Sequence, residues 1–373
     1  MSRLKILKPR NDYRQLFLVF KLKFNIISDA MDVELFNYEL PQNLIAQKPH
    51  IPRDECKLMV CNRSTGTVEH TIFKNIVKYL KKGDLLVLND TKVIPARIFA
   101  TKPTGGKVEI FLLEELERNR FLCLTRGKIK QETGVILKNG KEALVKKLPN
   151  SDKRVVEFED NENIYKLLEE VGEVPLPPYI KRNYDNYDKN KDFEFYQTVF
   201  ARKEGAVASP TAGLHFTQEL LEEVQVKGVK IAYITLHVGI GTFKPVKEKE
   251  VENHKMHRER FEISRETAEL FNETKLSGGK VIAVGTTVVR ALESSVNREG
   301  RLMPYKGSTE IFIYPGYQFK AIDSLITNFH LPKSTLLMLV SAFYSREKIL
   351  ECYKKAIEKQ YRFFSFGDAM FII

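Results

Sequence analysis

The spacing of apolar and polar residues changes character twice along the chain. Before residue 84, a helical period covers residues 73–80 and stops at the Lys-Lys-Gly turn of residues 81–83. From residue 85 onwards the apolar residues come in short runs that Gly-Gly, Gly and Asn-Gly turns separate. The runs occupy residues 85–89, 96–101, 107–113, 121–125, 135–137, 143–148 and 155–158. Regular short strands with turn residues between them predict a small β-barrel, which we place at residues 85–162.

The second change follows residue 163, where helical periods alternate with short apolar runs. The helical periods cover residues 164–171, 217–226, 267–275, 288–296 and 348–360, and buried-strand patterns cover residues 230–238 and 280–285. This alternation predicts an α/β fold with a largely parallel sheet. We therefore expect a discontinuous α/β catalytic domain, residues 31–84 and 163–373, into which the small β-barrel domain is inserted.

Length and composition agree with two globular domains. The 373 residues exceed the ~250–300 at which single cores stop growing. The longest apolar runs, such as residues 336–340, fall far short of the ~20 residues that cross a bilayer, so we expect no membrane segment. The four cysteines form no CxxC pair, which predicts reduced thiols and a cytoplasmic protein. No metal is expected, because no cysteine or carboxylate with ligand spacing accompanies His254 and His257.

The charge of the chain favours a polyanionic partner. Its formal net charge is +12 and its sequence pI about 9.3, and Lys and Arg displace counterions from nucleic-acid phosphates. Seven Lys or Arg against two Asp lie within residues 1–30, whose apolar run 16–20 is too short for a signal peptide. We expect Met31 to be the natural start and residues 1–30 to be a non-native or disordered extension. A basic tail that meets RNA is the alternative.

Three separated stretches each place a histidine between a flexible turn and an apolar run. They are residues 209–216 (SPTAGLHF), 235–243 (TLHVGIGTF) and 327–332 (TNFHLP). Such junctions between a buried strand and a loop are the usual place for ligand groups on an α/β scaffold. One histidine of this kind is more often a hydrogen-bonded core residue. Three of them lead us to expect that His215, His237 and His330 share one pocket.

A fourth stretch, residues 280–290 (KVIAVGTTVVR), is typical of a strand, a glycine turn and a helix start. Backbone N–H groups at such a helix start favour an anion, either a carboxylate or a phosphate. A plain N-cap by Thr286 or Thr287 explains the same letters almost as well. Arg290, one turn into the helix, favours the ligand. The stretch lacks a full GxGxxG, which disfavours a nicotinamide enzyme.

These stretches, with others in the same order, carry a family resemblance. The chain resembles the S-adenosylmethionine:tRNA ribosyltransferase-isomerase family of queuosine biosynthesis from about residue 33 to its last residue. Besides the three histidine stretches, the matching motifs are residues 38–41 (YELP), 44–49 (LIAQKP), 88–97 (LNDTKVIPAR), 105–109 (GGKVE), 175–180 (PLPPYI), 196–199 (YQTV), 254–257 (HKMH), 285–290 (GTTVVR), 311–316 (IFIYPG), 325–332 (LITNFHLP) and 361–370 (YRFFSFGDAM). The chain departs from the family pattern at Cys56 and Lys57, where the family usually has Ser and Arg, and at Ser209 and Ile240, where it usually has Ala.

The resemblance implies a reaction and its substrates. Members of the family transfer and isomerise the ribosyl part of S-adenosylmethionine, a co-substrate, onto 7-aminomethyl-7-deazaguanine at the wobble position of tRNA. The products are epoxyqueuosine-tRNA, adenine and methionine. The sulfonium acidifies the adjacent ribose carbon, so a base must remove a proton there, and the attacking amine must be neutral. The partner is thus the anticodon loop of a tRNA, and the resemblance implies a monomer.

Each candidate residue receives a role in this reaction. We expect His215, His237 and His330 to supply acid and base capacity, Thr211 and Thr242 to position the ribose or the modified base, and Arg290 with the Gly285 turn to hold the methionine carboxylate. The remaining substrate-binding candidates are Gly213, Gly239, Gly241, Thr286, Thr287 and Asn328. Aromatic candidates for holding the base are Tyr179, Phe216, Phe243, Phe329, Tyr361, Phe363, Phe364 and Phe366. Lys92, Arg97, Lys102 and Lys107 around the barrel are the candidates for tRNA docking.

Two other functions stay open at this point. A non-catalytic RNA-binding protein would use the barrel and the basic surface alone, with the histidines merely packed. An ordinary methyltransferase would use the same cofactor, but no glycine-rich first turn followed by an acidic residue is found early in the chain. The reaction products distinguish the three functions.

Overall fold

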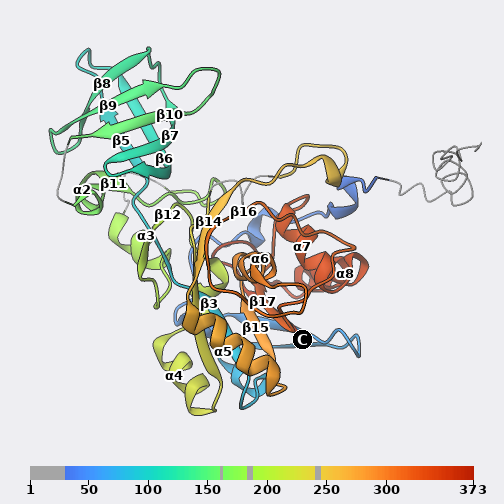
Figure 1. Ribbon diagram of the computed structural model, residues 1–373. Coiled ribbons are helices and arrows are strands. Elements are labelled where there is room, and N and C mark those ends of the chain that lie inside the picture. The colour runs from blue at the N-terminus through green and yellow to red at the C-terminus, as the bar shows by residue number, and fades with distance from the viewer. Residues whose placement is uncertain (1–29, 160–162, 183–187, 240–244) are drawn as a thin grey trace, which may run out of the picture.

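A nine-stranded mixed sheet forms the centre of the larger part of the molecule (Figure 1). The computed structural model describes residues 30–159, 163–182, 188–239 and 245–373. In spatial order the sheet consists of β16 (Tyr305–Thr309), β14 (Glu259–Ile263), β13 (Lys230–Leu236), β3 (Leu85–Asn89), β15 (Val281–Val284), β17 (Ser324–Asn328), β18 (Ala369–Ile372), β1 (Lys57–Cys61) and β2 (Val68–Ile72). The four central strands β13, β3, β15 and β17 run parallel, and antiparallel pairs flank them.

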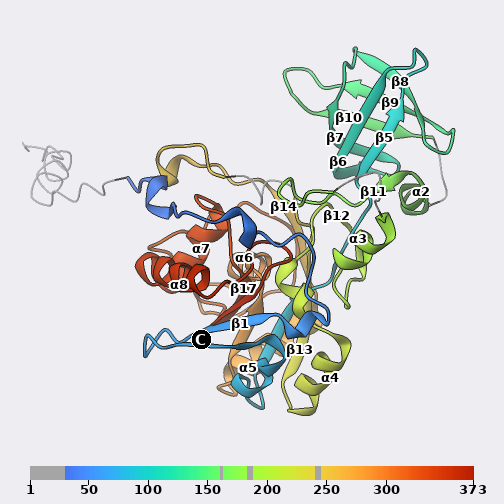
Figure 2. The same cartoon turned by 180° about the vertical axis from the view of Figure 1, so that it is seen from behind.

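Helices cover both faces of this sheet. The described α-helices are α2 (Ile164–Val171), α3 (Lys189–Phe195), α4 (Gln218–Val226), α5 (Arg265–Leu276), α6 (Thr286–Ser295), α7 (Thr335–Phe343) and α8 (Arg346–Glu358). Short 3-10 helices are η1 (Val33–Phe36), η2 (Gln42–Leu44), η3 (Arg53–Glu55), η4 (Phe73–Tyr79), η6 (Thr211–His215) and η8 (Val251–Asn253). One hydrophobic core holds α5 to α8 against the sheet, and a second holds α4 and η4 against its other face (Figures 1 and 2).

Strand β3 is buried on both faces of the large sheet. Leu85 and Val87 pack into the first core, Leu86 and Leu88 into the second, and all five residues of the strand are buried. A strand buried on both faces has a continuous apolar run and no alternation that would assign it to either layer. The placement of residues 85–89 in the barrel was therefore wrong, and β3 is the central strand of the large sheet.

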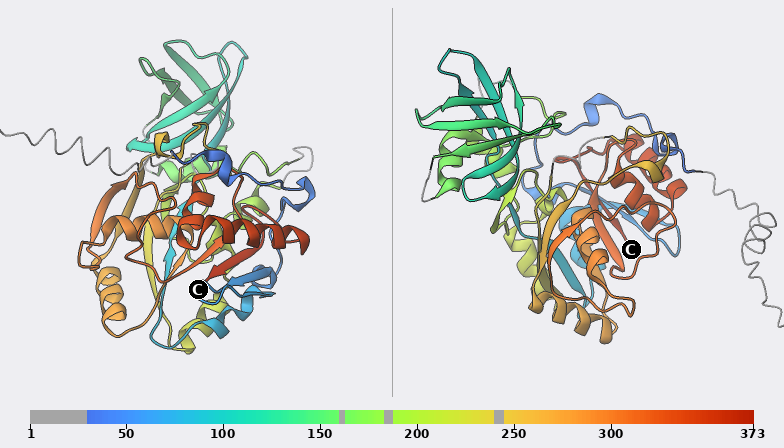
Figure 3. Two further views of the ribbon diagram at one scale, coloured as in Figure 1. Left: turned by 90° about the vertical axis from the view of Figure 1, so that its right-hand side faces the viewer. Right: turned by 45° about the horizontal axis from the view of Figure 1, so that its top comes forward.

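Six antiparallel strands close into a barrel that stands apart from the larger body (Figure 3). They are β5 (Arg97–Thr101), β6 (Lys107–Glu117), β7 (Arg120–Arg126), β10 (Arg154–Phe158), β9 (Glu142–Lys147) and β8 (Glu132–Leu137) in spatial order, and β8 pairs back with β5. Alternate residues such as Ile98, Ile110 and Val145 fill its interior. The predicted α/β class with an inserted small barrel is thus confirmed.

The barrel begins and ends later than predicted. Strand β4 (Thr91–Val93) pairs with β12 (Lys203–Ala206) in a separate two-stranded sheet, so Lys92 lies outside the barrel. Helix α2 presents Ile164, Leu168 and Val171 to the barrel core, and β11 (Gly172–Glu173) pairs with β5. An amphipathic pattern predicts a buried helix face but not its partner, so α2 was wrongly grouped with the α/β part.

Side-chain caps start six of the seven described α-helices. The capping residues are Asn163, Asp188, Thr217, Ser264, Ser334 and Ser345, each accepting a backbone N–H of the first turn. Helix α6 differs, because its N-cap is Gly285 and no side chain caps it. Within the described ranges, no helix combines the length and the hydropathy needed to cross a bilayer.

Candidate active site

The carboxyl ends of the four parallel strands meet at one edge of the sheet, where ligand sites of α/β folds usually form. A narrow cavity of about 30 Å³ lies there, enough for a water molecule or two. It is lined by Ser209, Pro210, Thr211, Ala212, Val238, Gly285, Thr286, Thr287, Thr327, Asn328, His330 and Leu336. All four stretches singled out from the sequence therefore contribute to one cavity, residues 235–243 only through Val238.

Asn89, the last residue of β3, holds this edge together. Its side-chain oxygen accepts the N–H of Leu236 at 3.0 Å, and its amide donates to the Leu236 carbonyl at 3.0 Å and to Thr287 Oγ1 at 3.4 Å. The side chain thereby joins β3, β13 and the start of α6. The available sequence signal was a polar residue directly after four apolar strand residues, and Asn89 was not among the predicted site residues.

The start of helix α6 faces the cavity without a side-chain cap. Gly285 has φ = 94°, a left-handed conformation that favours glycine, and its N–H donates to the Ile326 carbonyl at 2.8 Å. Thr286 and Thr287 are the first two helical residues, so neither is the N-cap that the alternative interpretation required. The free backbone N–H groups of this first turn and the positive end of the helix dipole favour an anion.

His330 lines the cavity, and its backbone is fixed from two sides. Its N–H donates to the Tyr353 hydroxyl at 2.9 Å, and the Tyr38 hydroxyl donates to its carbonyl. Its ring nitrogen Nε2 lies 2.8 Å from Thr327 Oγ1. Burial lowers the pKa of His330 to about 3, so the imidazole is neutral at pH 7. A neutral imidazole in this position can accept a proton.

His215 lies one hydrogen bond behind the cavity. The amide nitrogen of Asn328 donates to His215 Nε2 at 3.1 Å and to the Phe364 carbonyl at 3.2 Å, while Thr211 Oγ1 donates to Asn328 Oδ1 at 3.1 Å. Because Nε2 accepts, the proton of the neutral ring lies on Nδ1, which faces Cys56 Sγ at 3.2 Å. Burial, followed by the charges of Arg362 and Arg53, lowers the pKa of His215 to about 3.

His237 directly precedes Val238, the residue of its stretch that lines the cavity. Its Nδ1 lies 2.9 Å from Thr91 Oγ1, and Gly205 packs so close that an added Cβ would sit 3.0 Å from His237 Cε1. Burial and, after it, the charge of Arg260 lower the pKa of His237 to about 4. His237 does not line the cavity directly, whereas Val238, bridged to Ala208, does.

Arg290 binds Glu259 and a backbone carbonyl. Its Nη1 forms a buried ion pair with Glu259 of β14, and its Nε donates to the Ile311 carbonyl at 3.2 Å. The other Glu259 oxygen accepts the N–H of Gly239 at 3.1 Å. Arg290 is therefore absent from the cavity lining and acts on Gly239 through Glu259. Glu259 lies 31 residues from Arg290, and no sequence spacing indicates the pair.

The remaining predicted residues divide into several groups. Gly213 is packed against Phe200, where an added Cβ would come within 2.8 Å of the ring. Gly241, Thr242 and Phe243 lie outside the described residues. Most of the aromatic candidates are buried in the hydrophobic cores, namely Phe216, Phe329, Tyr361, Phe363, Phe364 and Phe366, and Tyr179 is partly buried beside Phe364.

The predicted RNA-contacting cations are divided between the two-stranded sheet and the barrel. Lys92 pairs with Glu204 at 3.0 Å on the two-stranded sheet, and Lys102 donates to the Lys128 carbonyl. Arg97 pairs with Glu109 at 2.7 Å on the barrel, where Lys107 is exposed. In the part of the chain that the structure describes, no three His, Cys, Asp or Glu side chains gather as metal ligands would.

Comparisons with known proteins identify the family of the chain. A family model described as "Queuosine biosynthesis protein" matches residues 33–372. A protein of Halothermothrix orenii named S-adenosylmethionine:tRNA ribosyltransferase-isomerase is 54% identical over 92% of this chain and all of its own length. A protein of the same name from Desulforamulus reducens is 50% identical over the same shares. The crystal structure of an S-adenosylmethionine tRNA ribosyltransferase from Thermotoga maritima, 39% identical, covers 91% of this chain and 100% of its own, with a TM-score of 0.52. The chain thus belongs to the queuosine biosynthesis protein family.

Proposed function

We propose that this chain transfers and isomerises the ribosyl part of S-adenosylmethionine onto 7-aminomethyl-7-deazaguanine at the wobble position of tRNA. The products are epoxyqueuosine-tRNA, adenine and methionine. The activity that the relatives' names state supports this proposal. The observation that carries it within the structure is the position of His330, which lines a cavity where four parallel strands end.

His330 is the base in this proposal, in which the cavity of about 30 Å³ has to widen to admit the ribose. The sulfonium acidifies the adjacent ribose carbon, and an imidazole that is neutral at pH 7 takes the proton. The resulting imidazolium is buried and therefore strongly acidic, so it returns its proton to the departing adenine. The ribose C1′ loses its bonds to adenine and to the ring oxygen, and C5′ loses its bond to sulfur, which leaves as methionine. In exchange C1′ bonds to the amine nitrogen and to C5′, and C5′ bonds to the former ring oxygen, which closes the epoxide. The proton that the attacking amine gives up goes to solvent. The scheme calls on no metal ion.

The other residues position the substrates. Thr211 and Asn328 present polar groups to the cavity, and His215 fixes the orientation of the Asn328 amide. The uncapped start of α6 takes the methionine carboxylate. Arg290 and Glu259 hold Gly239 beside the cavity, so they act on the substrate site indirectly. Thr286 and Thr287 line the cavity, and His237 and Gly239 flank Val238 beside it.

The barrel docks the tRNA in this proposal. A base in an anticodon loop is already partly unstacked, so its extrusion costs only a few kcal/mol. Arg97, Lys102 and Lys107 lie on the barrel, while Lys92 contributes from the strand that leads into it. A monomer is proposed from the family resemblance alone. The cytoplasm is the proposed location, since tRNA is modified there.

The test combines the protein, labelled S-adenosylmethionine and tRNA that carries the aminomethyl precursor. Adenine and methionine in equal amounts support ribosyl transfer, S-adenosylhomocysteine indicates a methyltransferase, and no turnover indicates RNA binding alone. In single turnover, His330→Gln should slow adenine release by about 10²–10⁴-fold. His70→Gln is the control, because His70 lies on the distant edge strand β2, where it contacts the Tyr361 hydroxyl. A folded His330→Gln protein with the rate of the wild type refutes the role of His330.

A further inference from the structure

A groove of about 760 Å³ crosses the outer surface of the barrel, away from the candidate active site. It lies where one edge of β5 passes from β11 to β8, since Ile98 pairs with Gly172 and Ala100 pairs with Leu137. Its size lies within the ~300–1,000 Å³ range of pockets for drug-sized ligands, which includes nucleotides. The described residues that line it come from β5, β6, β7, β8, β11, α2 and α3.

The lining of this groove is cationic. Lys107, Arg126, Lys138 and Lys189 line it, against the two carboxylates of Glu109 and Glu173. Glu109 is shared between Arg97 at 2.7 Å and Arg126 at 3.7 Å, so one carboxylate serves two guanidinium groups. The Arg126 side chain is 86% exposed. Cationic charge therefore remains at the surface for an anionic ligand.

The floor of the groove carries two exposed apolar side chains. Phe99 is 40% exposed and Ile136 37% exposed, and both line the groove. Ile98 and Ala100, on either side of Phe99 in β5, belong to the barrel core. Because side chains alternate along a strand, Phe99 points out of the barrel. The guanidinium of Arg97 lies 5.0 Å from the Phe99 ring centroid. An exposed ring beside cations is the arrangement on which single-stranded nucleic acid stacks its bases.

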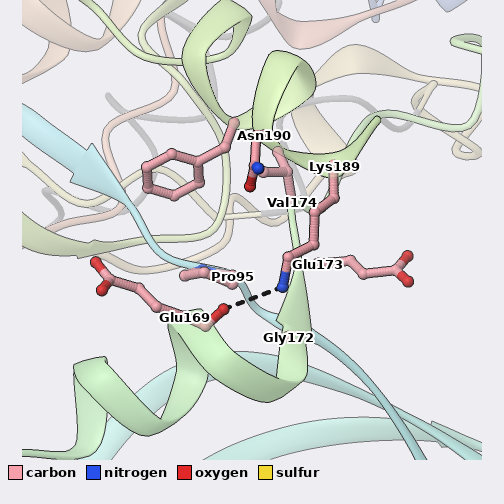
Figure 4. A pocket seen from close by; sticks show the side chains of 8 residues that line it. Pro95, Glu169, Gly172, Glu173, Val174, Lys189 and Asn190 are labelled. Atoms are coloured by element: carbon pink, nitrogen blue, oxygen red, sulfur yellow. Dashed lines mark hydrogen bonds between the residues drawn. The ribbon is translucent and has the colours of Figure 1, made fainter. Parts of the chain in front are cut away.

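The groove continues into a second pocket at the junction of the barrel and the larger body (Figure 4). The two pockets share Gly172, Glu173 and Lys189. Lys189 is held at this junction, because its Nζ donates to the carbonyl of Glu169 at 3.2 Å, near the end of α2. Pro95 and Val174, on the two chain segments that cross between barrel and body, line the second pocket. Val174 packs in the same small core as Leu214, which precedes His215.

We propose that this groove binds a single-stranded segment of the tRNA substrate, with a base on Phe99 and Ile136 and phosphates at Lys107, Arg126, Lys138 and Lys189. The inference rests on the proposed function and names the docking surface for its RNA. Single-stranded RNA is favoured over a duplex, because a flat exposed ring can stack only on an unpaired base. Arg126, Lys138 and Lys189 are additional to the cations expected from the sequence, and Phe99 is additional to the expected aromatic residues.

The test uses the full chain and a fluorescent anticodon stem-loop RNA, with binding measured by anisotropy over a series of KCl concentrations. One variant, Phe99→Leu, removes the ring but keeps an apolar side chain. The second, Arg126→Gln/Lys138→Gln, removes two exposed cations. The matched control is Lys78→Gln/Lys354→Gln, which removes two exposed lysines from η4 and α8 on the larger body. Thermal unfolding verifies that each variant is folded.

The two variants should fail in different ways. Phe99→Leu should weaken binding about tenfold at every salt concentration, because stacking does not release counterions. Arg126→Gln/Lys138→Gln should also weaken binding and should lower the slope of log K against log salt by about 1.4, or about 0.7 for each lost phosphate contact to a single strand. The control should match the wild type in affinity and, within one lysine's contribution, in slope.

Turnover separates this inference from the proposed function. At saturating RNA both groove variants should release adenine at the rate of the wild type, with a raised KM for tRNA. If the wild type releases adenine while both groove variants keep its Kd, KM and salt slope, the groove assignment is overturned and the proposed function stands. If the wild type releases no adenine, the proposed function itself fails. Equal loss of affinity in the control variant also overturns the assignment, because any surface lysine would then serve.

Discussion

Replacing Glu259 by Gln should destabilise the protein strongly although the two side chains have nearly the same shape. Glu259 and Arg290 are each 4% exposed at their side chains and form a buried ion pair. The Gln carbonyl can still accept the N–H of Gly239, so that hydrogen bond survives. The buried guanidinium loses its counter-charge, and leaving one member of a buried pair uncompensated costs about 3–5 kcal/mol.

The magnitude can be isolated in a double-mutant cycle. Urea unfolding is measured for the wild type, Glu259→Gln, Arg290→Met and the double variant. The double variant should cost less than the sum of the two single ones, because it leaves neither charge unpaired; we expect a difference of about 2 kcal/mol. Glu351→Gln is the control, since Glu351 pairs with Lys348 and Lys355 on α8, and each of these exposed pairs is worth at most ~0.5 kcal/mol.

Two results would refute this reasoning. A Glu259→Gln protein that loses less than ~1 kcal/mol would mean that the guanidinium is solvated or finds another partner. Strict additivity in the cycle would mean that the two side chains are energetically independent. Adenine release is a further readout, because Glu259 holds Gly239 next to Val238, which lines the cavity. We expect Arg290→Met to lower the rate through this contact.

Three further predictions follow from the same region. Burial lowers the pKa of His215 and of His330 to about 3, whereas a histidine of the unfolded chain has a pKa of about 6.5, so the unfolded chain binds more protons below pH 6.5. Urea unfolding should therefore show full stability above pH 6.5 and a loss of about 2 kcal/mol per histidine at pH 5. His330→Gln should remove the part of this pH dependence that His330 contributes. Gly285→Ala and Gly278→Ala, both at positive φ, should each cost about 1 kcal/mol in thermal unfolding. Only Gly285→Ala should also slow adenine release, since Gly285 lines the cavity and Gly278 does not. Cys56→Ser should keep the stability of the wild type because a hydroxyl still accepts from His215 Nδ1, whereas Cys56→Ala should cost about 1–3 kcal/mol in urea unfolding; equal losses in the two would refute the hydrogen bond.

The parts of the fold that sequence could predict are those in which local pattern decides. Barrel strands such as β6 and β9 alternate buried and exposed residues, and their runs were located within a few residues. The order of strands in the large sheet has no such local record. The last strand, β18, inserts between β17 and β1, so residues more than 300 positions apart become neighbours. Only the tertiary structure contains that pairing.

The site shows the same division. His330, Gly285 and Asn328 could be anticipated because each follows a buried strand at the edge where parallel strands end. The pattern could not show which of their atoms face the cavity. The partners of His215 and Arg290 lie 159 and 31 residues away, and a hydrogen bond over such a distance depends on how whole elements pack. Sequence spacing therefore located the cavity but not the groups that support it.

The three histidines share a lowered pKa, and their distances from the cavity separate their roles. A base must touch the reacting atoms, and His330 alone among the three lines the cavity. His215 reaches it through the Asn328 amide, which also accepts from Thr211. Substitution of His215 therefore misorients the Asn328 amide and should raise KM. Substitution of His330 removes the proton acceptor and should lower kcat. If both variants lower kcat alone and equally, His215 must exchange protons with the substrate, and the Asn328 contact would have to open during turnover.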